Sequence, residues 1–106
     1  MNNLENIIEI LQSEKQEILE KYGVQLLGIF GSYVRNEQTS ESDIDILVEI
    51  LKPVKIGLYD YIKIIHELSQ KLNIKVNFAN KNKLKPHIGK YILKEVVNLW
   101  KVKKKI

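Results

Sequence analysis

The sequence contains no cysteine, and among its 106 residues there are only two prolines and one tryptophan. The lack of cysteine excludes a disulfide framework and a zinc site built on thiolates. No apolar run approaches the roughly 20 residues that a membrane-spanning helix needs. The first residues also lack the basic start and the small-residue cleavage site of a signal peptide. We therefore expect a cytoplasmic protein with no membrane segment.

The composition is that of a small folded protein, with 44% hydrophobic and 28% charged residues. This length suits one compact domain covering residues 1–106. The formal net charge is +4, from 17 Lys and Arg against 13 Asp and Glu. Such a charge is compatible with an anionic partner but is far from that of a polycationic tail. The most basic run, residues 101–106, is interpreted as a solvated C-terminal tail.

Apolar residues recur at helical spacing in three segments. Two of these predict amphipathic helices, over about 3–22 and 58–72. The third begins at Pro86, a residue that suits the first turn of a helix. Its predicted apolar stripe consists of Ile88, Tyr91, Ile92, Val96 and Leu99.

Three short apolar segments predict strands, over 24–30, 44–50 and 74–79. Residues 33–36 predict one helical turn between the first two strands. In the second and third strands one face is apolar and the other is mainly polar. This pattern is typical of a sheet covered on one side. We therefore expect a small α+β fold with helices packed on one face of the sheet and the other face left open.

The most informative motif is Gly31-Ser32, followed after ten residues by Asp43-Ile44-Asp45. Carboxylates at positions i and i+2 of a strand point the same way, so Asp43 and Asp45 should converge. Two ionised carboxylates at close range repel each other unless a cation lies between them. A hard divalent cation with oxygen ligands, most naturally Mg²⁺, meets this need. The pair therefore predicts a magnesium site.

The residues around the glycine predict an anion-binding element beside that site. A glycine at a strand end allows close approach of a ligand to the backbone, and the Ser32 hydroxyl can donate to a phosphate oxygen. Arg35, the only arginine in the chain, can pair with phosphate or with a partner's carboxylate. Together these parts favour metal-assisted nucleotidyl transfer, in which the cation polarises the α-phosphate and stabilises the leaving pyrophosphate.

The segment GSYVRNEQTSESDID, with ILV after it, resembles the GS-x10-D-x-D signature of the minimal nucleotidyltransferase (MNT) family of the DNA polymerase β superfamily. The resemblance covers roughly residues 20–97. It implies a nucleotidyltransferase fold with a mixed sheet, ATP as substrate and Mg²⁺, with two ions, as cofactor. Gly31 and Ser32 would then hold the triphosphate, and Asp43 and Asp45 would bind the metal. Many members resemble antitoxins that silence a HEPN ribonuclease toxin by attaching AMP to one of its tyrosines.

The chain departs from the family pattern on the third predicted strand. Relatives carry a third Asp there, whereas this chain has Asn77 on the same face. An amide oxygen can reach a metal, but it is neutral and a poor proton acceptor, so Asn77 should weaken the catalytic ion and activate a hydroxyl poorly. Asn36 replaces the family's glycine after the arginine, and asparagine tolerates a left-handed turn.

The leading hypothesis is therefore a protein adenylyltransferase antitoxin that acts on a HEPN toxin. One alternative is a catalytically impaired antitoxin that acts by contact, as Asn77 suggests. Another is a nucleotidyltransferase acting on RNA or on a small molecule. Simple nucleic-acid binding is the least favoured alternative. It would use the lysines from 81 to 85, which are otherwise solvated or line the side on which a nucleotide or partner binds.

Overall fold

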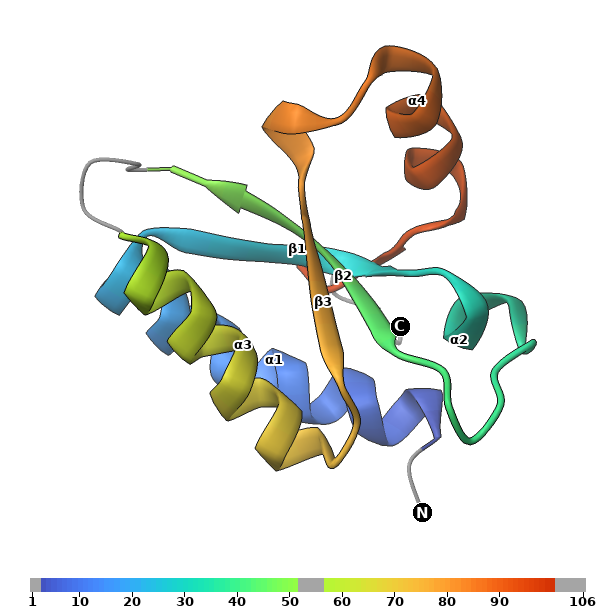
Figure 1. The fold of residues 1–106 in the computed structure, drawn as a ribbon, viewed down its shortest axis with the longest axis horizontal. Coiled ribbons are helices and arrows are strands. Elements are labelled where there is room, and N and C mark those ends of the chain that lie inside the picture. Colours follow the sequence, from blue (N-terminus) through green and yellow to red (C-terminus); the bar gives the residue numbers. More distant parts are fainter. Residues whose placement is uncertain (1–2, 52–56, 101–106) are drawn as a thin grey trace, which may run out of the picture.

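A computed structural model describes residues 3–51 and 57–100 of the chain. It contains a four-stranded sheet with the strand order β3-β2-β1-β4 (Figure 1). Strand β1 pairs antiparallel with β2 and β4, whereas β2 and β3 are parallel. The predicted α+β fold with a mixed sheet is therefore confirmed. In chain order the elements are α1 (Leu4–Tyr22), β1 (Val24–Phe30), α2 (Ser32–Arg35), β2 (Ile44–Ile50), α3 (Leu58–Leu72), β3 (Val76–Asn80), the short 3-10 helix η2 (Lys81–Lys83), α4 (Pro86–Glu95) and β4 (Val97–Asn98).

The helices α1 and α3 cover one face of the sheet (Figure 1). Ile7 and Leu11 from α1 and Ile64 and Leu68 from α3 are buried there against the strands, including Ile46 of β2. This packing confirms that the apolar face predicted for the second strand is the core face. Burial of these aliphatic side chains is the main source of stability, at about 25 cal/mol per Å² of apolar surface removed from water.

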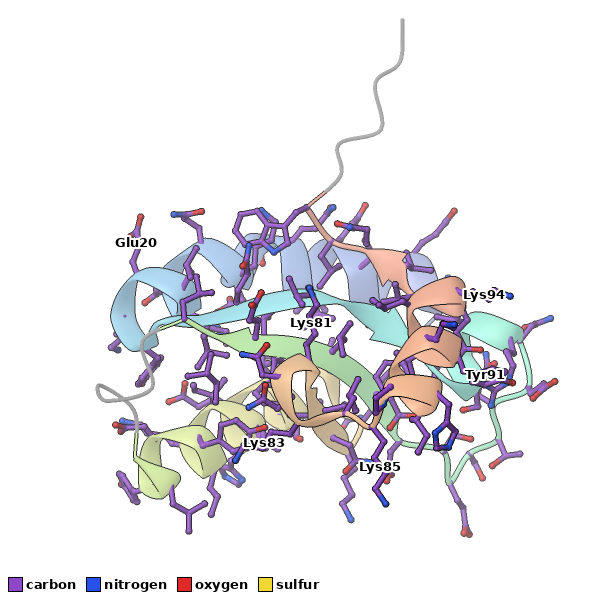
Figure 2. The ribbon with its side chains drawn as sticks, turned by 90° about the horizontal axis from the view of Figure 1, so that it is seen from above. Glu20, Lys81, Lys83, Lys85, Tyr91 and Lys94 are labelled. Carbon is purple, nitrogen blue, oxygen red and sulfur yellow. The ribbon has the colours of Figure 1, made fainter. Side chains whose placement is uncertain are left out.

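The second face of the sheet is less open than the sequence predicts. Helix α4 lies on the opposite side of the sheet from α1 and α3, as both views show (Figures 1 and 2). Leu47 alternates with the core residues of β2 and so belongs to this second face, yet it is only 1% exposed. The expectation of an open face was therefore correct only in part, because alternation along one strand does not show where a later helix will lie.

Most predicted boundaries agree with the structure because local signals set them. The first helix begins after Asn3, whose Oδ1 accepts the backbone N–H of Asn6 at 2.9 Å, and ends at Gly23 with φ 72°. The predicted ranges 24–30, 44–50 and 58–72 are confirmed. The third strand lies slightly later than predicted, and the helical turn begins one residue earlier, at Ser32.

The predicted extent of the last helix was wrong. Helix α4 ends at Glu95, so Val96 and Leu99 do not continue its apolar stripe. Instead, Val97 and Asn98 form β4 and pair with Ile29 and Gly28 of β1. A Cβ on Gly28 would lie 2.5 Å from the Val97 carbonyl oxygen, so the close approach of β4 depends on that glycine. The pairing depends on residues far away in the chain, which helical periodicity cannot reveal.

Within residues 3–51 and 57–100, every helix is too short or too polar to cross a membrane. The basic tail predicted for 101–106 lies outside the described residues.

Candidate active site

The two aspartates of the motif converge, as their spacing predicts. Asp45 lies in β2, and its partner in the parallel pairing with β3 is Asn77. The Nδ2 atom of Asn77 donates to Oδ2 of Asp43 at 2.9 Å and lies 3.4 Å from Oδ1 of Asp45. The two carboxylates, one directly before β2 and one within it, therefore face the same side chain of the neighbouring strand β3.

Asn77 occupies this point differently from the way the sequence predicts. Its amide nitrogen faces the carboxylates, whereas a metal ligand would have to present the amide oxygen. A half-turn of the amide exchanges the two atoms and leaves the rest of the side chain in place. Two carboxylates and one amide oxygen then form the hard donor set that Mg²⁺ prefers, so the residues fit the ion. In the described parts of the chain, no group of three or more His, Cys, Asp and Glu residues could hold a metal.

Gly31 lies directly against the Asp45 carboxylate of this pair. Its backbone has φ 92° and ψ −157°, a conformation that only glycine adopts readily. A Cβ at this position would collide with the Asp45 carboxylate. The pairing of Phe30 with Asp45 in the antiparallel β1–β2 ladder fixes this approach, and Ser32 follows at once as the first residue of α2. The predicted phosphate element and the predicted metal pair are therefore brought together.

The loop between α2 and β2 is also ordered by its own side chains. Asn36 ends α2 in the left-handed conformation, with φ 60°, as predicted for a residue in the place of the family's glycine. Further on, the Thr39 N–H donates to the Ser42 hydroxyl at 2.8 Å, and the Ser42 N–H donates to the Thr39 carbonyl at 3.1 Å. This small turn directly precedes Asp43 and helps to define where its carboxylate lies.

The sequence interpretation did not identify Glu95, which connects the last turn of α4 to the motif. Its carboxylate accepts the Gly31 N–H at 2.7 Å and the Arg35 guanidinium at 3.0 Å, and its side chain is only 16% exposed. Arg35 also donates to Glu37 at 3.0 Å. The one arginine, predicted to pair with phosphate or with a partner's carboxylate, therefore pairs with two carboxylates of its own chain. The available signal was that Glu95 is the last acidic residue and stands alone among lysines.

The electrostatics of the site concentrate negative charge at Asp45. Burial is the main reason why the pKa of the Asp45 carboxyl lies above its usual value, and the Asp43 charge adds to this effect. The Asn77 hydrogen bond and the positive charge of Arg35 act in the opposite direction. Hydrogen bonds from Arg35 to Glu37 and Glu95 raise the pKa of the guanidinium further, so it stays cationic. A carboxylate that is partly desolvated and close to a second one is suited to bind a cation.

Comparison with known proteins identifies the family. The model of the nucleotidyltransferase domain matches residues 5–99. This chain belongs to the nucleotidyltransferase domain family. A Methanocaldococcus jannaschii protein, named provisionally as a protein adenylyltransferase, is 44% identical over 98 residues, covering 92% of this chain and 98% of the relative. The protein adenylyltransferase MntA of Thermococcus cleftensis is 40% identical, covering 92% of this chain and 96% of the relative.

Solved structures support the same fold for this nucleotidyltransferase. A minimal nucleotidyltransferase matches with a TM-score of 0.72 and 23% identity, covering 90% of this chain and 94% of that one. A complex of the tri-AMPylated HEPN toxin of Shewanella oneidensis with an MNT antitoxin matches with a TM-score of 0.60 and 18% identity, covering 90% and 73%. The resemblance that the motif predicts is therefore confirmed at the level of family and fold.

Proposed function

We propose that this chain is a magnesium-dependent protein adenylyltransferase that uses ATP to modify, and thereby neutralise, a HEPN ribonuclease toxin. The observation that carries the proposal is the convergence of Asp43 and Asp45 on one point beside Gly31. The name of the Thermococcus relative and the HEPN–MNT complex support this choice of acceptor. Site geometry alone would fit any nucleotidyl transfer.

Each residue of the site has a role in this proposal. Gly31 and Ser32 hold the triphosphate, and Asp43 and Asp45 hold Mg²⁺ with Asn77 as a neutral third ligand. When bound, the metal supplies the Lewis acid that polarises the α-phosphate. An acceptor hydroxyl would give its proton to one of the site carboxylates, Asp43 or Asp45, as its oxygen forms a bond to the α-phosphorus. The bond from the α-phosphorus to the bridging oxygen would break, and pyrophosphate would leave.

Arg35 has a less direct role, because Glu95 and Glu37 already hold its guanidinium. The Arg35 guanidinium can contact a phosphate only if the phosphate replaces one of these two carboxylates as its partner. In the arrangement described here, Arg35 contributes positive charge close to Asp45 and ties α2 to α4. We therefore place it in the nucleotide site through its charge and its support of the Gly31 turn.

A second candidate function is neutralisation of the toxin by contact, without AMP transfer. Asn77 favours it, because an amide donor relieves the repulsion between the two carboxylates without a cation. It also removes the negative charge that relatives of this family place at the third position, and it is a poor proton acceptor. Inhibition of the toxin that needs no ATP and survives Asp43→Asn would support this candidate.

The test is transfer of label from α-labelled ATP to a HEPN ribonuclease toxin. The chain, Asn77→Asp and Asp43→Asn are compared with Mg²⁺ and with EDTA. Magnesium-dependent labelling of the HEPN protein by the chain, lost in Asp43→Asn, is the expected result. Labelling by Asn77→Asp alone would identify a disabled enzyme. Absence of labelling by both would refute the enzymatic proposal.

A further inference from the structure

A groove lies between η2 and the first turns of α4, on the second face of the sheet. Its volume is about 310 Å³. Its apolar lining comes from Leu84, Pro86, Gly89 and Leu93. Lys81, Lys85 and Lys90 complete the lining. We call this feature the η2–α4 groove. It combines a concave apolar surface with several positive charges.

The segment that forms the groove has no negative charge of its own to balance these lysines. Residues 81–94 contain five lysines and neither Asp nor Glu, which exceeds the net charge of +4 of the whole chain. In residues 3–51 and 57–100, the ion pairs involve Arg35 and Lys71 but none of these five. Glu95, the next acidic residue, is paired with Arg35 and Gly31. Figure 2 shows Lys81 and Lys85 beside the groove, Lys83 on the side of η2 away from α4, and Lys94 at the end of α4. The groove is therefore suited to an anionic occupant.

Exposed apolar side chains on α4 indicate that this occupant is a protein. Leu93, which lines the groove, is 51% exposed, and Ile88 and Tyr91, which lie on α4 outside this lining, are 42% and 65% exposed. In protein interfaces such side chains contribute the buried contact area, while the surrounding charges set orientation and association rate. A nucleic-acid backbone offers phosphates and sugars, which leave the aliphatic lining residues Leu84 and Leu93 unpartnered.

Helix α4 connects the groove to the active site. The groove is at its first turns, and Glu95 in its last turn accepts the Gly31 N–H at 2.7 Å. Ten residues of helix span about 15 Å. An extended peptide covers this distance with about five residues. One short segment of a partner can therefore occupy the groove and still place an acceptor side chain at the nucleotide.

We infer that the η2–α4 groove is the docking site for the acceptor protein. It takes an apolar side chain flanked by Asp or Glu, on the same segment that carries the acceptor hydroxyl. This inference rests on the proposed function, since that function requires a protein acceptor. To the proposed function, the inference adds the place where the acceptor protein is held and the chemistry by which it is recognised.

Two variants test the groove. Lys90→Glu reverses one of its charges. Gly89→Leu fills it, and a Cβ at Gly89 meets Leu84 at an ordinary contact distance of 3.5 Å, so the helix itself is not strained. Lys63→Glu is the matched control, because Lys63 is exposed on α3 across the sheet. Thermal melting of each variant verifies that it is folded.

The measured quantities are the KM for the HEPN protein, the KM for ATP, and the affinity for immobilised HEPN protein without ATP. We expect Lys90→Glu and Gly89→Leu to raise the KM for the HEPN protein and to weaken its binding at least tenfold. The KM for ATP should stay within twofold, and Lys63→Glu should behave like the unaltered chain. The difference between Lys90→Glu and the unaltered chain should shrink as salt is added, because salt screens exposed charges.

The outcomes separate this inference from the proposed function. If the unaltered chain transfers no AMP but the groove variants lose binding to the HEPN protein, the docking site stands and the enzymatic proposal falls. If all variants transfer AMP with the same KM for the HEPN protein, the docking site is refuted and the enzymatic proposal stands. Loss of binding to a labelled single-stranded RNA in Lys90→Glu, with HEPN binding unchanged, would overturn the inference in favour of a nucleic-acid partner.

Discussion

Replacing Asn77 by aspartate tests the central feature of the site, which is that two carboxylates share one donor. In the chain, the Asn77 amide donates at 2.9 Å to Asp43 and lies 3.4 Å from Asp45. Asn77→Asp exchanges this donor for a third carboxylate at nearly the same place. Without a cation, three negative charges then face one another. With Mg²⁺ present, the same three charges should bind the ion more tightly than the original set.

The size of the effect follows from these distances. Two unit charges about 3 Å apart interact with about 1.4 kcal/mol in water and about 5.5 kcal/mol at an effective dielectric constant of 20. Asn77 is exposed, so the lower part of this range applies and the side chains can move apart. The lost hydrogen bond adds about 1 kcal/mol. We therefore expect Asn77→Asp to lower the free energy of unfolding by about 1–3 kcal/mol in EDTA, or about 4–8 °C in Tm for each kcal/mol.

The assay is thermal unfolding in EDTA and across a magnesium titration, at constant ionic strength. Magnesium should raise the Tm of Asn77→Asp more than that of the unaltered chain, since a ligand at 100 times its Kd stabilises by about 2.7 kcal/mol. Asn80→Asp on the same strand is the matched control, because its side chain accepts the Asn82 N–H and an aspartate can do the same. A variant Asn77→Asp that melts like the unaltered chain in EDTA and gains nothing from magnesium would refute the reasoning.

Changes at three further positions probe other parts of the site. Gly31→Ala should destabilise the fold by about 1–3 kcal/mol, because the backbone conformation is strained for any other residue and the new Cβ collides with Asp45; chemical denaturation would show a lower midpoint, and an unchanged midpoint would contradict the close approach. Burial raises the pKa of the folded-state Asp45 carboxyl. The stability that this carboxyl contributes is present below its usual pKa and is lost as the pH rises through the raised folded-state value. In EDTA, Asp45→Asn should therefore gain stability relative to the unaltered chain as the pH rises above the usual range of an aspartate, and a constant difference would argue against a raised pKa. Glu95→Ala should cost about 1–3 kcal/mol, since the buried Gly31 N–H loses its acceptor. Glu95→Gln keeps an acceptor, so its Tm should lie between those of the unaltered chain and Glu95→Ala. Equal Tm values for the unaltered chain and both variants would mean that the hydrogen bond from the Gly31 N–H to Glu95 adds no stability.

Some features of the site were predictable from sequence because they depend on neighbours along the chain. The alternation of apolar and polar residues in 44–50 identified the core face of β2. Continued back by one residue, the same alternation placed Asp43 and Asp45 together on the opposite side. The position of Asn77 beside them followed from alternation in the third strand together with the family pattern. Which of its amide atoms faces the carboxylates was not predictable, since that depends on the hydrogen bonds made across two strands.

Other features were missed because they join segments that are distant in sequence. Helical spacing in 86–99 was extended through Val96 and Leu99, although Val97 and Asn98 pair with β1 beside Gly28. The same early end of α4 brings Glu95 to Gly31 and Arg35. Burial of Leu47 on the second face likewise depends on tertiary packing and not on the alternation of its own strand.

The sequence by itself determined α1, α3, the first three strands, the family and the residues that meet at the carboxylate pair, because apolar periodicity and turn residues act over a few positions. Only the tertiary structure decided the fourth strand, the role of Glu95 and the η2–α4 groove. These three features depend on which segments, distant in sequence, pair with the edge of the sheet and cover its second face. The free energy of such contacts is gained only when the whole chain packs together.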